Sequence, residues 1–426
     1  MKKIFLPLCF LCAATIGKAQ SLSITEQKII VYINQHLPQA KQLLATTVNI
    51  NSGTLNIDGV KKVGAIYAAE LEKAGLKTEW VIFSDSLKRA GHLVATKKGS
   101  KGKRVFLIGH LDTVFEPDMP TNPWKILNDS TATGQGANDM KGGDVIIITA
   151  LQALNSLGLM DDVSVIAYFT GDEERGGTPR TDFIQRAKQC DVALGFETAV
   201  GLNTVATARR GASSWKLNVT AKTGHSSGVF SNGAGFGAIY EAARILEAFR
   251  VQLSTEKYLT FNPGLIVGGS EVNYNETKAK GEAIGKTNII SPAVTVTGDL
   301  RFLTEEQKTA ARDKMRAIVA ASLNGTKATI SFNDGIPGMA PTEGNKQILK
   351  IIDSISQAIG IGNTVAGDPG SRGAGDISYV AKYLDCIDGL GSSGKGAHAP
   401  GETINLKEFP LLIQRAAILI YRLTHL

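Results

Sequence analysis

The spacing of apolar positions along the chain predicts an α/β protein. Apolar residues recur at helical spacing over Ile24 to Ala45 and Ile57 to Ala74, and Gly75 follows the second run as a helix C-terminus often requires. Further helices are expected over 141–156 and 181–188, and they alternate with short β-rich runs at 80–83, 92–96, 105–108, 163–169 and 192–196. Strands that alternate with helices indicate a mostly parallel sheet covered by helices on both faces.

The pattern changes after about Arg210. Strand-like alternation over Ser213 to Ala221 is followed by a helix, two extended runs, a second helix and a last strand, at 236–249, 265–267, 293–296, 305–321 and 328–332. This β-α-β-β-α-β order predicts a small ferredoxin-like domain. The first pattern then resumes with a helix near Asn345, a strand around Ile387 and a closing helix from Leu406 to Tyr421. We therefore expect one domain over 21–210 and 338–426, interrupted by an inserted domain over 211–337.

The start of the chain predicts export. At 426 residues the chain is long enough for two domains, and its 43% hydrophobic and 20% charged residues are those of a globular protein. Residues 1–20 combine a basic start with a short apolar run, which is typical of a signal peptide cut near Ala19-Gln20. No later run reaches the ~20 apolar residues of a membrane span, and Cys9 and Cys12 follow no lipid-attachment sequence. We expect a protein without a membrane anchor, in the periplasm or secreted.

Charge and cysteine content exclude two further classes. Removing the signal peptide takes away three lysines and lowers the formal charge from +7 to +4, and no basic run with aromatic residues remains to bind nucleic acid. Cys190 and Cys386 lack the paired spacing of a thiolate zinc site. They can form one disulfide or remain as two buried thiols, and the sequence leaves both alternatives open.

Five polar segments mark a candidate site. They are Gly109–Val114, Gly134–Gly143, Thr170–Gly177, Phe196–Thr198 and Gly391–Glu402. Several of them follow core strands, where open α/β sheets bind ligands. Each has a structural alternative when taken singly; Asp139, for example, suits a helix N-cap, although its glycine-rich turn lacks the ending of a phosphate-binding loop.

Together these segments point to a metal centre. Three consecutive carboxylates, Asp172, Glu173 and Glu174, repel one another unless a dication compensates their charge. The charge of two Zn²⁺ ions would be balanced by one hydroxide and three carboxylates beside neutral histidines, and mixed nitrogen and oxygen ligands suit Zn²⁺, with Mn²⁺ or Co²⁺ as alternatives.

The five segments, in this order and around an inserted domain, resemble the glutamate carboxypeptidase (carboxypeptidase G type) and acetylornithine deacetylase family of dinuclear zinc peptidases. The resemblance implies that Asp139 bridges two ions, with His110 and Glu197 completing one site and Glu174 and His398 the other. It implies that Glu173 is the general base, which takes a proton from a metal-bridging water, and that Asp112 orients His110.

The resemblance also gives the inserted domain a role as a lid and dimerisation domain. His225, Asn288 and Arg301 lie in segments that resemble the family's substrate-binding segments, and in relatives the histidine reaches the active site of the partner subunit. One loop departs from the family pattern: Gly370–Asp376 carries Ala374 and Gly375 where a Gly-Gly-Thr-Asp sequence is usual.

The expected function is that of an exported dinuclear zinc exopeptidase. It would act as a homodimer on a peptide or an N-acyl amino acid and hydrolyse the amide bond before a C-terminal, acidic residue. The alternatives are an N-acyl-amino-acid deacylase or a dipeptidase of the same family. A periplasmic binding protein without catalysis is less favoured, because a pure binder has no need of Glu173.

Overall fold

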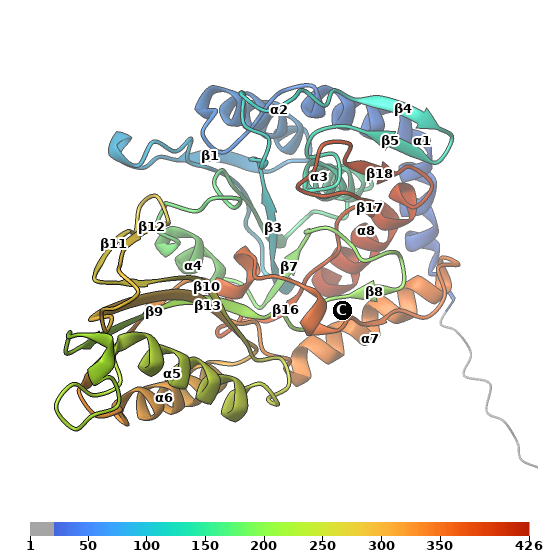
Figure 1. Cartoon of the computed structure of the whole chain (residues 1–426). Helices are drawn as coiled ribbons and strands as arrows, with labels where there is room; N and C mark the ends of the chain where they lie inside the picture. Colours follow the sequence, from blue (N-terminus) through green and yellow to red (C-terminus); the bar gives the residue numbers. More distant parts are fainter. Residues whose placement is uncertain (1–20, 426) are drawn as a thin grey trace, which may run out of the picture.

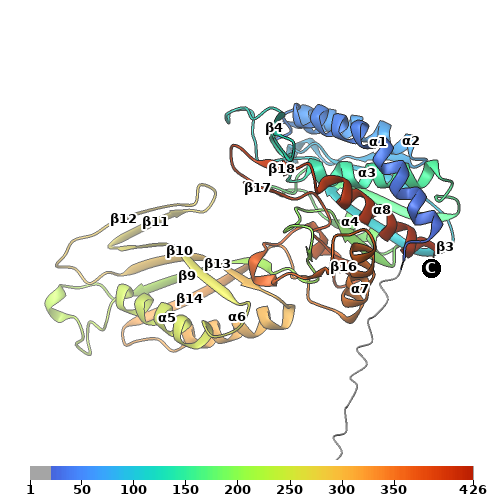
Figure 2. The ribbon, with the colours of Figure 1, turned by 90° about the vertical axis from the view of Figure 1, so that its right-hand side faces the viewer.

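A computed structural model describes residues 21–425, which form two modules (Figures 1 and 2). The main module holds the chain before Gly211 and after Asp334, and the inserted module holds the strands and helices between them. The predicted signal peptide, residues 1–20, lies outside the described residues. None of the described helices is long and apolar enough to cross a membrane.

The main module is built on a six-stranded mixed sheet. Only β2 runs against the other strands, so the sheet is parallel except at one edge. In spatial order the strands are β1 (Lys77–Val81), β2 (His92–Lys97), β6 (Val163–Thr170), β3 (Lys101–His110), β7 (Val192–Gly195) and β16 (Asp385–Ile387). The strand expected at 105–108 is longer than predicted, and His110 is therefore its last residue rather than part of a loop.

Helices cover both faces of this sheet. Alternate residues of β3 face opposite ways: Val105 and Leu107 belong to the core under α1, α3 and α8, whereas Phe106 and Ile108 pack with Phe183 of α4. The helices are α1 (Ile24–Val48), α2 (Ile57–Lys73), α3 (Lys141–Ser156), α4 (Thr181–Ala187), α7 (Glu343–Ala358) and α8 (Phe409–His425). The central strands β3, β6 and β7 are thus buried over most of their length, and their carboxyl ends are where polar groups can reach a ligand.

The short strands at one end of the main module are not predicted from the sequence. A four-stranded sheet has the order β17 (Gly394–Lys395), β18 (Thr403–Asn405), β5 (Thr131–Thr133) and β4 (Lys125–Asn128), and β8 (Thr204–Val205) pairs with β15 (Val365–Ala366). Pairing of β18 with β5 brings the segment around His398 beside the one around Asp139, although some 260 residues separate them in the sequence.

The inserted module is a four-stranded antiparallel sheet with α5 and α6 on one face (Figure 2). Its strands, in spatial order, are β10 (Thr260–Gly269), β13 (Ala293–Phe302), β9 (Gly211–Ala221) and β14 (Thr326–Asp334); the helices are α5 (Ala238–Leu253) and α6 (Glu305–Ala320). A hairpin that the sequence analysis did not predict, β11 (Glu271–Asn275) with β12 (Lys280–Ile284), stands on the face opposite the helices.

The two cysteines of the described chain are free. Cys190 and Cys386 are both buried and unbonded, which decides between the two alternatives left open by the sequence. Burial raises the pKa of the Cys190 thiol to about 12, so this thiol stays protonated and unreactive.

Candidate metal centre

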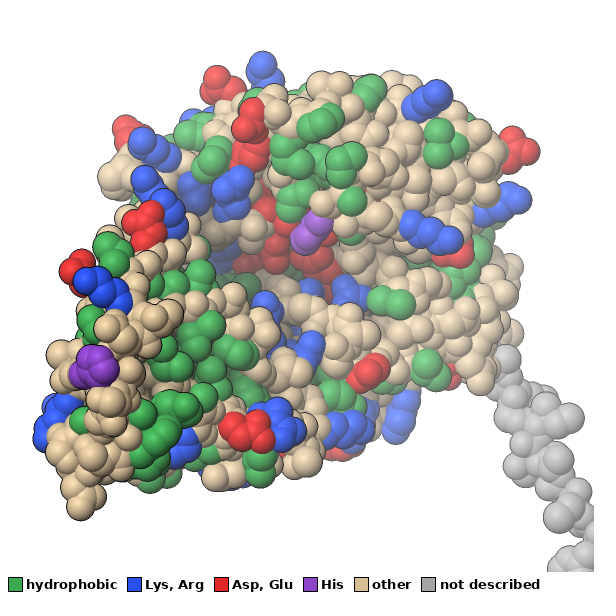
Figure 3. Space-filling model, in the orientation of Figure 1, with side chains coloured by type: hydrophobic (Ala, Val, Ile, Leu, Met, Phe, Trp, Pro, Cys, Tyr) green, Lys and Arg blue, Asp and Glu red, His purple; other side chains and the backbone are tan. Residues whose placement is uncertain are grey.

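The carboxyl ends of three neighbouring parallel strands carry the predicted site. His110 ends β3, Glu173 and Glu174 follow the end of β6, and Glu197 follows the end of β7. Because these strands are adjacent and parallel, their ends meet at one edge of the sheet. Figure 3 shows acidic side chains gathered in a hollow between the two modules, with a histidine beside them.

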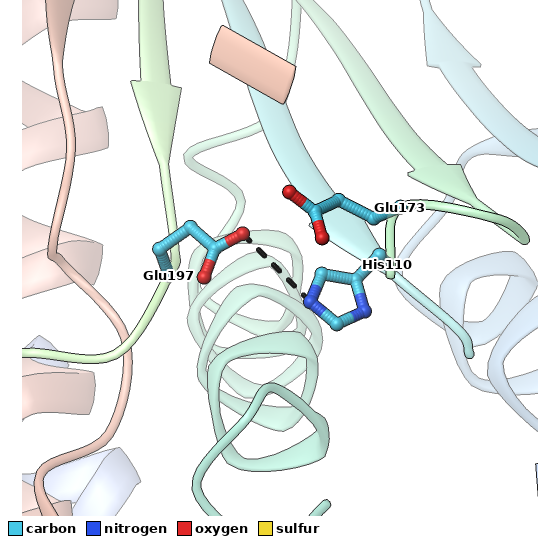
Figure 4. Close-up of side chains that lie close together, drawn as sticks. All are labelled: His110, Glu173 and Glu197. Atoms are coloured by element: carbon cyan, nitrogen blue, oxygen red, sulfur yellow. Dashed lines mark ion pairs between the residues drawn. The ribbon is translucent and has the colours of Figure 1, made fainter. Parts of the chain in front are cut away.

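Asp139 lies between two histidines. Its Oδ1 is 3.4 Å from Nε2 of His110, and its Oδ2 is 3.0 Å from Nε2 of His398. Each histidine also approaches one glutamate: His110 Nε2 is 3.7 Å from Oε1 of Glu197 (Figure 4), and His398 Nε2 is 3.2 Å from Oε2 of Glu174. Asp139 thus gives one oxygen to each side of a two-part cluster, as a bridging ligand would.

The same cluster meets the requirements of a cation site. One oxygen or nitrogen of each of His110, Glu173 and Glu197 lies within 4.8 Å of the others, and the same holds for His110, Asp139 and Glu174. Nε2 of His110 and Oε1 of Glu174 are buried without a hydrogen-bond partner, although buried polar atoms nearly always have one. A donor set of imidazole nitrogen and carboxylate oxygen fits Zn²⁺ and related divalent ions.

Asp112 supports the cluster from behind. The Nδ1 atom of His110 lies 3.0 Å from the Asp112 backbone oxygen and 3.5 Å from its Oδ1, so the other ring nitrogen faces the cluster. The Asp112 carboxylate also accepts the backbone N–H groups of Glu173 and Glu174, at 3.0 and 3.2 Å, and the hydroxyl of Thr54 at 2.7 Å. One buried carboxylate therefore fixes both a histidine ring and the loop of acids.

Glu402 performs a similar task for Asp139. Its carboxylate accepts the N–H groups of Gly136, Asn138 and Asp139 at 3.1, 2.7 and 2.8 Å. Burial raises its pKa to about 7 in spite of these bonds. Glu402 lies in one of the five predicted segments but has no predicted role, because nothing near it in the sequence signals a partner more than 260 residues away.

Burial and mutual repulsion shift the titration of the cluster. Burial raises the pKa of Glu173 well above its ordinary value and that of Glu197 to about 7, and neighbouring carboxylates add to both shifts. For His110, burial alone would lower the pKa, but Asp112, Asp139 and Glu197 outweigh it and raise the pKa. Hydrogen bonds to Asp139 and Glu174 raise the pKa of His398 to about 11. Without a cation, this concentration of negative charge is relieved only by bound protons.

A second buried network, which the sequence analysis missed, lies under the acidic loop. Arg180 donates to Asp172 at 2.8 Å and to Asp376 at 2.9 Å, and so ties the acidic loop to the first residue of η4 (Asp376–Tyr379). His92 accepts the N–H of Gly171 at 3.1 Å from the other side. Asp172 and Asp376 lie in segments that the sequence singles out, but nothing near Arg180 or His92 marks these two residues as partners, because they come from separate elements.

The predicted substrate residues lie apart from the cluster. His225 and Asn288 are exposed and neighbour each other, since Ser226 N–H donates to the Asn288 carbonyl at 2.9 Å. Arg301 is half-buried on β13, and its Nε donates to Asp299 at 2.8 Å. Within the described chain, none of the three forms a hydrogen bond or ion pair with the five candidate metal ligands.

Comparison with known proteins places this arrangement among the hydrolases. The chain is 27% identical over 390 residues to Carboxypeptidase G2 of a Pseudomonas species, which covers 90% of this chain and 89% of the relative. Among solved structures, an aminopeptidase from Bacillus cereus superposes with a TM-score of 0.71 at 16% identity, over 90% of this chain and 98% of that one. An M20 family metallo-carboxypeptidase from Sulfolobus solfataricus gives 0.64 at 16% identity, over 90% and 99%.

The match to a family model assigns the chain to a family, which the shared fold alone does not. Residues 106–422 match the family described as peptidase family M20/M25/M40, and this stretch includes every candidate metal ligand. The main sheet, the acidic cluster and this match agree. The chain belongs to peptidase family M20/M25/M40 and is a metallopeptidase-type hydrolase with a site that can hold two metal ions.

Proposed function

We propose that the protein is an exported dinuclear zinc exopeptidase that releases a C-terminal, acidic amino acid from a peptide or N-acyl amino acid. Glu173 is the observation that carries this proposal: its half-buried carboxylate lies beside the two-part cluster and forms no ion pair with another residue of 21–425. A relative with carboxypeptidase in its name, similar over 90% of the chain, supports the direction of cleavage.

The metal ions would be held by five residues. His110 and Glu197 would bind one ion, Glu174 and His398 the other, and Asp139 both. When bound, the two ions supply Lewis acidity, which polarises the scissile carbonyl and lowers the pKa of water.

Glu173 would move the proton. The backbone of its loop is held by the Asp112 carboxylate, and within residues 21–425 the Glu173 carboxylate forms no hydrogen bond or ion pair of its own. Its raised pKa suits a group that takes a proton from water and gives it to the leaving nitrogen. Asp112 would hold His110 with Nε2 towards the cluster.

Arg301 would recognise the free carboxylate of the substrate. The bond to Asp299 uses only its Nε, so the two terminal nitrogens can still form a planar fork with a carboxylate. This arrangement supports a substrate that ends in a free acid.

The inserted module would act as a lid and a dimerisation surface. Arg301 pairs with Ala212 near the start of β9, whereas His225 follows the end of that strand at Ala221. At ~3.3 Å per residue the two sites are about 30 Å apart, too far for one small substrate to touch both in one subunit. His225 and Asn288 would therefore serve the site of the partner subunit.

A substrate panel tests the proposal. The zinc-loaded mature protein is incubated with dipeptides and N-acyl amino acids that vary on each side of the amide, and the released amino acids are identified by mass spectrometry. Preferential release of C-terminal Glu or Asp supports the carboxypeptidase. Cleavage governed by the acyl group would make the protein a deacylase, and release from short dipeptides alone a dipeptidase. Absence of turnover, with metal bound, would favour a binding protein.

Export is tested separately. Expression with the full leader should place a mature chain that begins near Gln20 in the periplasm or medium. An unprocessed chain retained in the cytoplasm would contradict the proposal.

A further inference from the structure

One buried ion pair beside the site has no part in the mechanism above. The guanidinium of Arg209 is only 5% exposed, and all its nitrogens are used. Its Nη1 binds the buried carboxylate of Asp388, while Nε and Nη2 donate to the carbonyls of Gly373 and Ala374 at 2.8 and 2.7 Å. The planar fork of one arginine thus supports two successive peptide groups.

Gly375 is required for this contact. A Cβ atom at position 375 would collide with Nη1 of Arg209, so only glycine lets the loop rest on the guanidinium. At this position of the loop, Arg209 therefore occupies the space that a side chain would need.

The support also fixes which way the peptide groups point. These peptides are trans, and in a trans peptide the N–H points opposite to the carbonyl. Since the carbonyls of Gly373 and Ala374 face Arg209, the N–H groups of Ala374 and Gly375 face away from it. Neither N–H donates to another residue within 21–425. Two adjacent unpaired donors form a small binding site for an anionic oxygen.

This pair of donors lies beside the acidic cluster. The next residue, Asp376, accepts the hydroxyl of Thr170 at the end of β6 and is bound by Arg180, which also holds Asp172. The charge of Arg209 interacts with those of Glu197 and Glu173. The loop is therefore tied to the same strand ends that carry the candidate base.

We infer that Arg209, paired with Asp388, is a positioning residue that aims the N–H groups of Ala374 and Gly375 at the substrate's terminal carboxylate. The inference rests on the proposed function and adds to it: recognition of the free acid is divided between Arg301 on the inserted module and a loop held by Arg209 on the main module.

Two glycines of this loop give a matched test. Gly375→Ala adds a methyl group that must displace the loop from Arg209. The methyl group that Gly373→Ala adds has no neighbouring atom within 4 Å. For a substrate with a free C-terminal acid, Gly375→Ala should raise KM about tenfold or more with kcat within about threefold, because the lost contact binds substrate and transition state alike. Gly373→Ala should keep KM within about twofold.

Arg209→Lys provides the second variant. Lysine keeps the positive charge opposite Asp388 but lacks the planar guanidinium that binds the two carbonyls. Arg209→Lys should therefore raise KM as Gly375→Ala does. The double variant should show little further change in KM. For a C-terminally amidated substrate the same variants should alter KM little. Unchanged thermal melting and metal content show that the variants are folded.

Binding without turnover separates this inference from the proposed function. In a Glu173→Gln background, calorimetry compares the affinity for N-acetyl-L-glutamate with that for its α-carboxamide. Gly375→Ala should weaken binding of the acid about tenfold and leave the amide unchanged, even if the wild-type protein hydrolyses a different amide. Equal affinity of the Gly375→Ala and Gly373→Ala proteins for the acid would overturn the inference.

Discussion

At the scale of single residues, two neighbouring acids of the site make different contacts. Glu173 and Glu174 are adjacent, and Asp112 accepts the N–H of both, yet only Glu174 contacts a histidine. Asp112 thus holds the backbone of both residues, while their side chains differ in contacts. A carboxylate pinned by its backbone alone remains free to exchange a proton.

Replacement of Glu173 by glutamine tests that role. The amide is of the same size but cannot accept a proton from water, so kcat should fall by at least 10² to 10⁴-fold, the usual contribution of a general base. Bound metal and melting temperature should stay near those of the wild type. The matched change Glu174→Gln should instead lower the metal content. Undiminished turnover by Glu173→Gln would remove Glu173 from the mechanism.

His92 gives a prediction about stability and pH. Burial lowers its pKa, and the charge of Arg180 lowers it further against the opposing charges of Asp172 and Asp376. The folded chain therefore holds this ring neutral, while the unfolded chain binds a proton below about pH 6.5. Since the unfolded state then binds more protons, the free energy of unfolding falls as the pH drops.

The variant His92→Asn should remove the part of this fall in the free energy of unfolding that His92 causes. Asparagine can still accept the Gly171 N–H but does not titrate, so the decline between pH 7.5 and 5.5 should shrink by up to about 1.4 kcal/mol. Denaturant unfolding at several pH values measures the free energy of unfolding and therefore this decline. His36→Asn, on α1 outside this network, is the control; an identical decline in both variants would disprove the assignment.

At this scale the sequence predicts the residues that meet the cluster but not those that hold them. His110 and Glu197 lie in recognisable segments at strand ends, and Asp139 lies in the glycine-rich turn before α3. Arg209 and Glu402 act through partners far away in the sequence, and their own neighbours give no sign of it. A supporting contact depends on tertiary structure, which a single sequence does not display.

At the scale of elements, strands with strong apolar runs were predictable and short polar ones were not. The predicted run 163–169 corresponds to β6, because a strand buried on both faces is almost wholly apolar. The hairpin of β11 and β12 was missed, since its sequence is polar and mostly exposed. The small sheet that brings His398 to Asp139 consists of strands of two to four residues, too short for any periodicity.

The convergence of so many acidic elements predicts a marked effect of metal removal. Acids that follow β6 and β7 lie close to the acid in the turn before α3, and bound cations would offset their repulsion. A ligand present at 100 times its Kd contributes about 2.7 kcal/mol to the free energy of unfolding. Dialysis against a chelator should therefore lower the melting temperature, and added Zn²⁺ should restore it.

A ligand variant provides the control for this experiment. His398→Asn removes one exposed candidate ligand, and its melting temperature should fall less on chelation than that of the wild type, because less metal is bound at the start. Equal melting temperatures before and after chelation, with loss of metal verified by elemental analysis, would show that the cluster does not depend on cations for stability.

At the scale of the whole molecule, the inserted module exposes an apolar surface. The α5–β10 face, defined by Ile239, Tyr240 and Val251 on α5 and Ile266 on β10, leaves more than half of each side chain exposed. Strand β10 is also an edge of its sheet, with unpaired backbone groups. Both features are typical of a surface that pairs with a second copy.

A charge on this face should break the proposed dimer. Ile266→Lys should change the mass measured by light scattering from two chains to one. Ile126→Lys, at an equally exposed position on β4 of the main module, should leave two chains together. A wild-type protein that is already a single chain at micromolar concentration would refute dimerisation.

The distance between Arg301 and His225 leads to a sharper prediction about assembly. If each site uses Glu173 of one subunit and His225 of the other, His225→Ala and Glu173→Gln proteins are both inactive alone. A heterodimer of the two has one site with both residues intact. Mixing equal amounts under conditions that exchange subunits should restore on the order of a quarter of the wild-type rate. If both residues act within one subunit, every mixed site lacks one of them and mixing restores nothing.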